Sequence, residues 1–269
     1  MGLRCALAPL TLAVVGLVNA LTALTFAAVG LRLLRRPVLA EDRFAMRALT
    51  VWWWCLGLFL ALQAALTLAA VQGTVSVPAS TWVRYATGPL LAVGSWGLCF
   101  HILYLATGKR GVAPLLAAYF TLVALAYDAA AYLHPIVALA PAAWEVTPTY
   151  SPPLEGNPLW TAVLAGVGVP LLAACVAYLA LAGKLDARDQ KRRVVLVSCG
   201  ILLWVGSGLA AQLAGGPLAR FFTITVLGLL AALAVFLAYF PPAWLRRRDP
   251  PPRIRFGEEL RLPPLPPAP

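Results

Sequence analysis

The sequence predicts an all-α fold: a polytopic membrane protein whose helices form a seven transmembrane helix bundle. Of the 269 residues, 61% are hydrophobic and only 12% are charged, whereas a soluble domain carries about 25% charged residues. The apolar residues are grouped in blocks of about 20 or more, which is the length that a membrane-spanning helix requires. The basic residues gather in the connections on one side of these blocks, as they do in inner-membrane proteins.

The predicted spans cover about residues 6–34, 48–72, 81–106, 113–134, 159–183, 194–214 and 221–243. With a rise of ~1.5 Å per residue, each can cross a hydrocarbon layer of ~30 Å. Helices are predicted because a backbone in lipid must satisfy its own hydrogen bonds. Residues 1–245 then form one transmembrane domain, and residues 246–269 form a basic, proline-rich cytoplasmic tail with a preference for polyproline II.

The orientation follows from the positions of lysine and arginine. Eighteen of the 21 basic residues follow the first, third, fifth and seventh spans, and only Arg4, Arg84 and Arg220 lie on the other side. The N-terminus is therefore predicted outside and the C-terminus inside, in a multi-pass protein of the cell inner (cytoplasmic) membrane. The net charge of +11 is explained by these connections, so no nucleic-acid partner is expected. An Arg-, Ala- and Leu-rich composition favours a bacterial origin.

Aromatic residues are predicted at both membrane boundaries. Trp52, Trp53 and Trp54 are assigned to the inner boundary, and Trp82 to the outer one. The proline-rich outer connection 135–158 either forms a lid over the outer mouth or joins distant helix ends; both interpretations stay open.

One acid, Asp128, lies inside the fourth predicted span. An intramembrane carboxylate costs about 2.5–3.5 kcal/mol on insertion scales and usually faces the bundle interior. A stripe of small residues, Ala117, Thr121, Ala124 and Ala131, shares its predicted helix face. Asp128 either lines an outer polar cavity or is a structural hydrogen-bonding group. The candidate ligand-binding residues at its depth are Asp128, Arg84, Tyr85, Tyr132, Gln212 and Arg220.

Chemistry beyond binding finds little support in the sequence. His101 is interpreted as a hydrogen-bonded structural residue, and His134 as an interfacial one. Cys55, Cys99, Cys175 and Cys199 lie near the depth of His101, but they lack metal-ligand spacing, so no metal site and no cofactor is expected. All three lysines follow apolar blocks on the basic side, which excludes a retinal Schiff base in the seventh span. We therefore expect no enzymatic activity.

Gly166, Gly168 and Pro170 should loosen or kink the fifth span, as in a mobile receptor or transporter helix.

Two of the predicted spans begin with similar sequences. The third span opens with "RYATGPLLAV" and the seventh with "RFFTITVLGL", each with an Arg, an aromatic residue and a Thr in matching places. A three-plus-one-plus-three duplication would produce this echo, as it does in transporters built from parallel repeats.

Two stretches carry a family resemblance: "WVRYATGPLLAVGSWGLCFHILYLATGKR" at 82–110 and "DARDQKRRVVLVSCGILL" at 186–203. They resemble the seven-transmembrane sensor region of bacterial histidine kinases, over about half of the chain. In that family too, an Arg-Tyr-like pair opens the third span and a charged, Gln-containing loop leads into the sixth. Where the kinase would follow, this sequence continues with a proline-rich tail. The resemblance therefore implies a sensor-like module whose signal passes through another protein.

The function predicted from these features is that of a receptor-like or sensory protein, active in signal transduction through a partner in trans. The lipid bilayer is its surrounding partner, a small ligand is expected from the outer side, and a cytoplasmic signalling partner at the inner loops or the proline-rich tail. The alternatives are a small-solute transporter with Asp128 as an ion site, and a structural subunit of a membrane complex.

Overall fold

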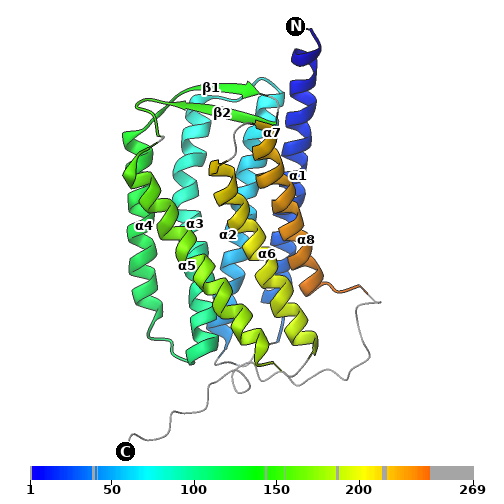
Figure 1. Ribbon diagram of the computed structural model, residues 1–269, viewed down its shortest axis with the longest axis vertical. Coiled ribbons are helices and arrows are strands. Elements are labelled where there is room, and N and C mark those ends of the chain that lie inside the picture. Colours follow the sequence, from blue (N-terminus) through cyan, green and yellow to red (C-terminus); the bar gives the residue numbers. More distant parts are fainter. Residues whose placement is uncertain are drawn as a thin grey trace, which may run out of the picture.

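The computed structural model is a bundle of long helices with a β-hairpin across one end (Figure 1). It describes residues 2–242 apart from 38–39, 41, 143, 155, 186–187 and 214–216. The predicted tail, 246–269, lies outside the described residues.

The helices are α1 (Gly2–Leu34), α2 (Arg43–Val71), α3 (Val77–Thr107), α4 (Ala113–Leu133), α5 (Pro158–Gly183), α6 (Arg188–Leu213), α7 (Pro217–Arg220) and α8 (Leu227–Tyr239), with a π-helical segment η1 (Phe221–Val226) between α7 and α8. Within the described residues, six helical segments are long and apolar enough to cross a membrane: Pro9–Leu34, Arg43–Val71, Val77–Thr107, Ala113–Leu133, Pro158–Gly183 and Leu218–Tyr239. They overlap six of the predicted spans, so the prediction of a helical bundle with apolar helices of membrane-spanning length is confirmed. The predicted span 194–214 falls on α6, which ends beside the undescribed residues 214–216.

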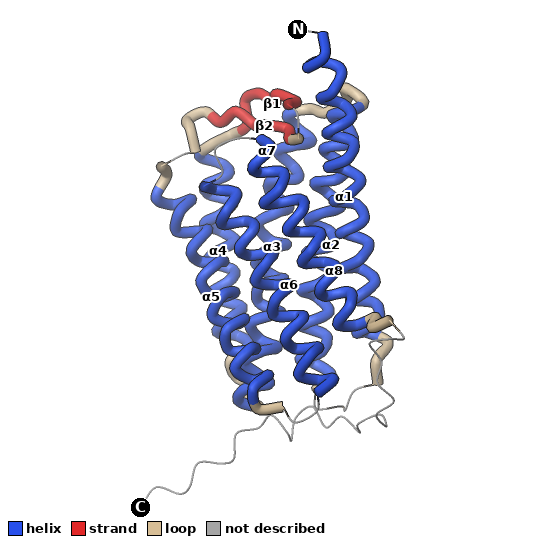
Figure 2. The backbone as a smooth tube through the Cα atoms, turned by 45° about the vertical axis from the view of Figure 1, so that its right-hand side comes forward, coloured by secondary structure: helices blue, strands red, loops and turns tan. Residues whose placement is uncertain are grey.

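Neighbouring helices in the sequence pack side by side, and α8 closes the ring between α6 and α1 (Figure 2). α3 contacts α2 and α4 and also reaches α5. The connections α1–α2, α3–α4 and α5–α6 lie at the end opposite the hairpin (Figure 1). We call the end with these three connections the basic end, because they are rich in lysine and arginine, and we call the opposite end the hairpin end.

The close approach of α2 and α3 depends on a residue without a side chain. A Cβ on Gly97 would overlap the carbonyl oxygen of Ala48 in α2. Small residues at such crossings let helix backbones approach, and dispersion between the closely packed surfaces then holds the pair together in lipid.

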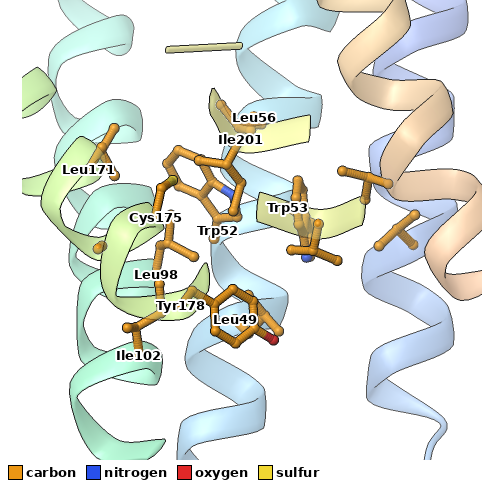
Figure 3. Close-up of a cluster of buried hydrophobic side chains, with 14 of the residues drawn as sticks. Leu49, Trp52, Trp53, Leu56, Leu98, Ile102, Leu171, Cys175, Tyr178 and Ile201 are labelled. Atoms are coloured by element: carbon orange, nitrogen blue, oxygen red, sulfur yellow. The ribbon is translucent and has the colours of Figure 1, made fainter. Parts of the chain in front are cut away.

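The core fills the middle of the bundle and is built around two tryptophans (Figure 3). Trp52 and Trp53 are 0% and 1% exposed, and Trp52 meets Trp204 of α6 edge-on, with ring centroids 5.6 Å apart. The assignment of Trp52 and Trp53 to the membrane boundary is therefore wrong. They lie on the α2 face that packs inward, and only Trp54, on the opposite face, stays exposed. Trp82 is exposed near the start of α3.

The connection between α4 and α5 folds into a hairpin that the sequence did not predict. Strand β1 (Ile136–Ala142) pairs antiparallel with β2 (Glu145–Tyr150), in a register that joins Ile136 to Tyr150 and Ala142 to Glu145. The fold is thus α-helical with one small β-element. Hairpin residues form the roof of a cavity, so the segment is a lid and not only a connection between distant helix ends.

Candidate functional site

Beneath the hairpin lies a cavity of two adjoining chambers. The upper chamber has a volume of about 300 Å³ and is walled by the hairpin and by the hairpin ends of α1, α2, α3, α4, α5 and η1. The lower chamber, of about 310 Å³, continues into the bundle. The residues that line both are Asn19, Thr87, Tyr127, Trp160, Ile224 and Thr225. Cavities of this size hold small molecules in proteins.

The two chambers differ in chemistry. The upper chamber carries the charged side chains Arg84, Glu145 and Arg220, with neutral hydrogen-bonding groups from Asn19, Gln63, Thr67, Ser80 and Tyr150. The lower chamber is lined mainly by apolar side chains, and Leu60, Leu171 and Trp204 at its edge also pack against the core. A polar chamber that opens onto an apolar one suits a ligand with a polar head and an apolar body.

Arg84 is the buried cation of the upper chamber. Its side chain is 9% exposed, and its Nη1 donates a hydrogen bond of 2.5 Å to the backbone carbonyl oxygen of His134. Its guanidinium carbon lies 4.5 Å from the centre of the Tyr150 ring, which gives a cation–π contact. Its Nη2 is buried and has no hydrogen-bond partner among the described residues. Arginine stays protonated in proteins, so this is a buried positive charge with one donor unused.

Tyr150 covers Arg84 without neutralising it. Burial raises the pKa of the Tyr150 phenol, and the nearby Arg84 cation opposes that rise only in part. The phenol therefore stays protonated at neutral pH and supplies the face of its ring, not a negative charge.

The tip of the hairpin is fastened to the far side of the bundle. Arg220 and Glu145 form an ion pair of 3.3 Å, and the Trp144 ring lies 4.3 Å from that of Phe221. Trp144 has a φ of 78°, a left-handed conformation that costs free energy for a bulky residue. The contact with Phe221 helps to hold this conformation. The lid thus runs from the end of α4 to η1.

His134 anchors the other end of the lid. It is 6% exposed, its Nδ1 lies 2.9 Å from the carbonyl oxygen of Pro152, and its Nε2 pairs with the Asn157 side-chain amide. This network assigns the proton to Nδ1, which donates to Pro152, while Nε2 accepts from Asn157. Asn157 Oδ1 in turn caps α5 by accepting from the backbone N–H of Leu159 at 2.8 Å. His134 was predicted to be an interfacial residue. It is instead buried, and its hydrogen bonds connect α3, α4, α5 and the hairpin.

Asp128 lies beside the cavity rather than in its lining. Its Oδ1 is buried, has no hydrogen-bond partner within the described part of the chain, and lies against Gly88 of α3. Among the described side chains, neither Arg84 nor Arg220 forms an ion pair with it. The inward face of α4 is centred on Phe120, Tyr127 and Ala131, whereas Ala117 and Thr121 are exposed. The predicted small-residue stripe is thus rotated from the true packing face.

The remaining predicted site residues are dispersed. Arg84 and Arg220, which open the two similar sequence stretches, both line the upper chamber. Tyr85 is partly buried but does not line either chamber. Tyr132 is 76% exposed and points away from the bundle. The side chain of Gln212, in the last turn of α6, lies outside the described residues.

At Pro170, where the sequence predicts a kink, α5 has a substitute hydrogen bond from a neighbouring helix. Pro170 has no N–H, so the carbonyl oxygen of Gly166, four residues earlier, loses its helical donor. The Tyr119 hydroxyl of α4 donates to this oxygen at 2.9 Å. Below this point α5 packs into the core through Cys175 and Tyr178, and above it α5 lines the lower chamber. The Tyr119 hydroxyl therefore replaces the backbone hydrogen bond that α5 lacks between its two halves.

Near the basic end, His101 is a packed residue. It is buried, its Nδ1 lies 3.0 Å from the carbonyl oxygen of Ala45, and its ring meets Tyr178 edge-on. Within the part of the chain that the structure describes, no group of three His, Cys, Asp or Glu side chains is placed to hold a metal ion.

Sequence reasoning missed several residues that build the cavity. Asn19, Gln63, Tyr150 and Trp160 come from four different elements and enter the site only through the packing of the helices. Asn19 and Gln63 are polar residues inside predicted spans, and this position could have marked them as residues of a polar site.

The comparisons with protein-family models, with curated proteins and with solved structures give no match to this chain.

Proposed function

We propose that this chain is a receptor-like, seven-helix protein of the cytoplasmic membrane, which binds a small ligand at the hairpin end and signals through a partner at the basic end. α6 completes the seven spans in this proposal. The hairpin end faces outward and the basic end faces the cytosol, because basic connections are retained on the cytosolic side. The resemblance to the sensor region of histidine kinases points to the same class of function.

The observation that carries the proposal is the cavity with a lid at one end of the bundle. Helices line both chambers, and Leu60, Leu171 and Trp204 at the edge of the lower chamber pack on the core that lies between it and the basic end. A ligand could therefore be held from one side without crossing to the other. A packed core below the chambers favours the binding of a ligand over the transport of a solute.

α5, which has Pro170 inside it, supplies a route for the signal. It lines the lower chamber above Pro170 and packs in the core below it, so a ligand that moves the upper half can change the lower half. The π-helical segment η1 also borders both chambers, and such segments are frequent at functional sites.

The transporter alternative has lost its main argument. It assigned an ion site to Asp128, and that carboxylate lies outside the lining of both chambers. Uptake of a solute by proteoliposomes would revive the transporter alternative. Stoichiometric copurification with a larger complex would favour a structural subunit.

The test is whether filling the lower chamber moves the basic end. Gly228 borders this chamber, and a Cβ added there meets no atom within 4 Å, so Gly228→Leu should fill space without a clash. Spin labels at Gly111 and Gly183, both exposed and free of neighbours, would report the distance between the α3–α4 connection and the end of α5. We expect the distance distribution in nanodiscs to shift in Gly228→Leu.

The matched control is Gly206→Leu. Gly206 has equally open space around a Cβ but borders neither chamber. It should leave the spin-label distances unchanged. Identical distributions in both variants and in the parent chain would contradict coupling between the two ends, and with it the receptor proposal.

A further inference from the structure

Among the residues that the structure describes, those lining the upper chamber carry one positive charge more than negative charges. Its charged lining residues are Arg84, Arg220 and Glu145, and Glu145 is already paired with Arg220. Arg84 keeps an unpartnered Nη2, and the Tyr150 ring contacts the cation without cancelling its charge. A buried, uncompensated cation in a low-dielectric site attracts an anion strongly.

Neutral hydrogen-bond donors line the same chamber as this cation. The side chains of Asn19, Gln63 and Ser80 border the upper chamber and form no hydrogen bond to another described residue. An anionic head group could therefore receive hydrogen bonds from Arg84 and from amide or hydroxyl groups together. Such a set fits a compact head with one negative charge, for example a carboxylate.

The lower chamber sets the shape of the rest of the ligand. Its walls are mainly leucine, valine, tryptophan and phenylalanine side chains, and its volume is about 310 Å³. Along α3 the lining runs from Arg84 to Leu91, a distance of about 10 Å at ~1.5 Å per residue. This space suits one alkyl chain of medium length, and it is too small for the two chains of a phospholipid.

We infer that the cavity binds a single-chain amphipathic carboxylic acid, with its head group at Arg84 and its alkyl chain in the lower chamber. This inference rests on the proposed function, because it names the ligand class of the same site. Decanoate is the simplest molecule with this head, this single chain and this length.

Photolabelling of the full chain in nanodiscs tests the inference directly. The probe is a decanoate analogue with a diazirine near the end of its chain. We expect labelling of residues that line the lower chamber, such as Val163 and Leu164. Unlabelled decanoate should suppress the labelling, whereas decanol and decylamine at the same concentration should not. Phosphatidylglycerol in the nanodisc should not suppress it either, because it is an anion with two chains.

Two variants address the head and the tail separately. Arg84→Gln removes the charge and should weaken labelling at least tenfold, as the loss of a buried charge-assisted contact does. Gly208→Leu places a side chain in the lower chamber, where a Cβ meets no atom within 4 Å. This side chain occupies the space of the alkyl chain and should abolish labelling. Gly206→Leu, two residues away on the same helix and outside both chambers, should label like the parent chain. Since Gly208→Leu leaves the Arg84 contacts intact, the test does not depend on the folding of the Arg84 variant.

The outcomes separate this inference from the proposed function. Equal competition by decanol or decylamine would overturn the acid head group, and competition by phosphatidylglycerol would overturn the single chain. Labelling that persists in Gly208→Leu would overturn the placement in the lower chamber. All three results leave the spin-label test of the receptor proposal standing, because that test uses Gly228→Leu and needs no ligand.

Discussion

At the scale of single residues, the charged positions of the site were partly readable in the sequence. Arg84 and Arg220 were predicted at the depth of Asp128, and both line the upper chamber. Asp128 stood out as the acid inside the fourth predicted span but lies beside the cavity, since one step along a helix turns a side chain by about 100°. Depth in the membrane can be read from sequence position, whereas the direction of a side chain depends on which face of α4 packs inward.

His134 gives a residue-scale prediction about the lid. His134→Ala removes the hydrogen bond from Asn157 and the one to Pro152. We expect the free energy of unfolding to fall by about 1–3 kcal/mol, because buried polar partners are left unpaired. Unfolding in mild detergent, followed by circular dichroism, measures the change. The neighbouring Tyr132→Ala, at an exposed site, should stay within about 0.5 kcal/mol of the parent chain. Equal losses in both variants would refute the anchoring role.

Trp52 gives a second residue-scale prediction, on the core. Trp52→Ala leaves a cavity between α2, α3 and α6 and should lower the free energy of unfolding by about 3 kcal/mol. This value is at the lower end of the usual range, since lipid offers little hydrophobic driving force between helices. Trp82→Ala, where the side chain is 75% exposed, is the matched control and should change stability little. A loss of stability confined to the Trp82 variant would return Trp52 to the membrane boundary.

At the scale of elements, helices were predicted well and the hairpin was not. A membrane span can be recognised in the sequence because every helix face in contact with lipid must be apolar. The ends of the apolar run then mark the approximate ends of the helix. The connection 135–158 contains five prolines in addition to Pro135, which hides the alternation expected of a strand. Its pairing is supported by contacts from elsewhere in the chain, at Arg84, Arg220 and Phe221. No local pattern encodes those contacts.

The junction within α5 gives an element-scale prediction. Tyr119→Phe removes the hydroxyl that satisfies the Gly166 carbonyl and preserves the shape of the ring. We expect faster hydrogen exchange of the backbone amides around residues 166–171, measured by mass spectrometry in nanodiscs, with a loss of stability of about 1 kcal/mol. The peptides around Cys175 and Tyr178 serve as an internal reference and should be unchanged. Unaltered exchange at 166–171 would show that the Tyr119 hydroxyl does not support the junction.

At the scale of the whole molecule, the bundle separates its tasks between two ends. The middle is filled by a packed aromatic core, the hairpin end contains the two chambers, and the basic end carries the arginine- and lysine-rich connections. The overall arrangement follows from lipid acting as the solvent for most of the chain. The sequence could predict this because composition alone reports it, but it could not predict a cavity, which is the sum of many small gaps between helices.

The most direct test of this arrangement is the accessibility of single cysteines from either side of the membrane. In a chain whose native cysteines are replaced by alanine, Val137→Cys places a thiol on the exposed hairpin and Gly111→Cys places one at the basic end. We predict that a membrane-impermeant maleimide added to intact spheroplasts labels residue 137, and labels residue 111 only after permeabilisation. Labelling of both residues from the same side, or the reverse pattern, would contradict a membrane-spanning bundle with its hairpin facing outward.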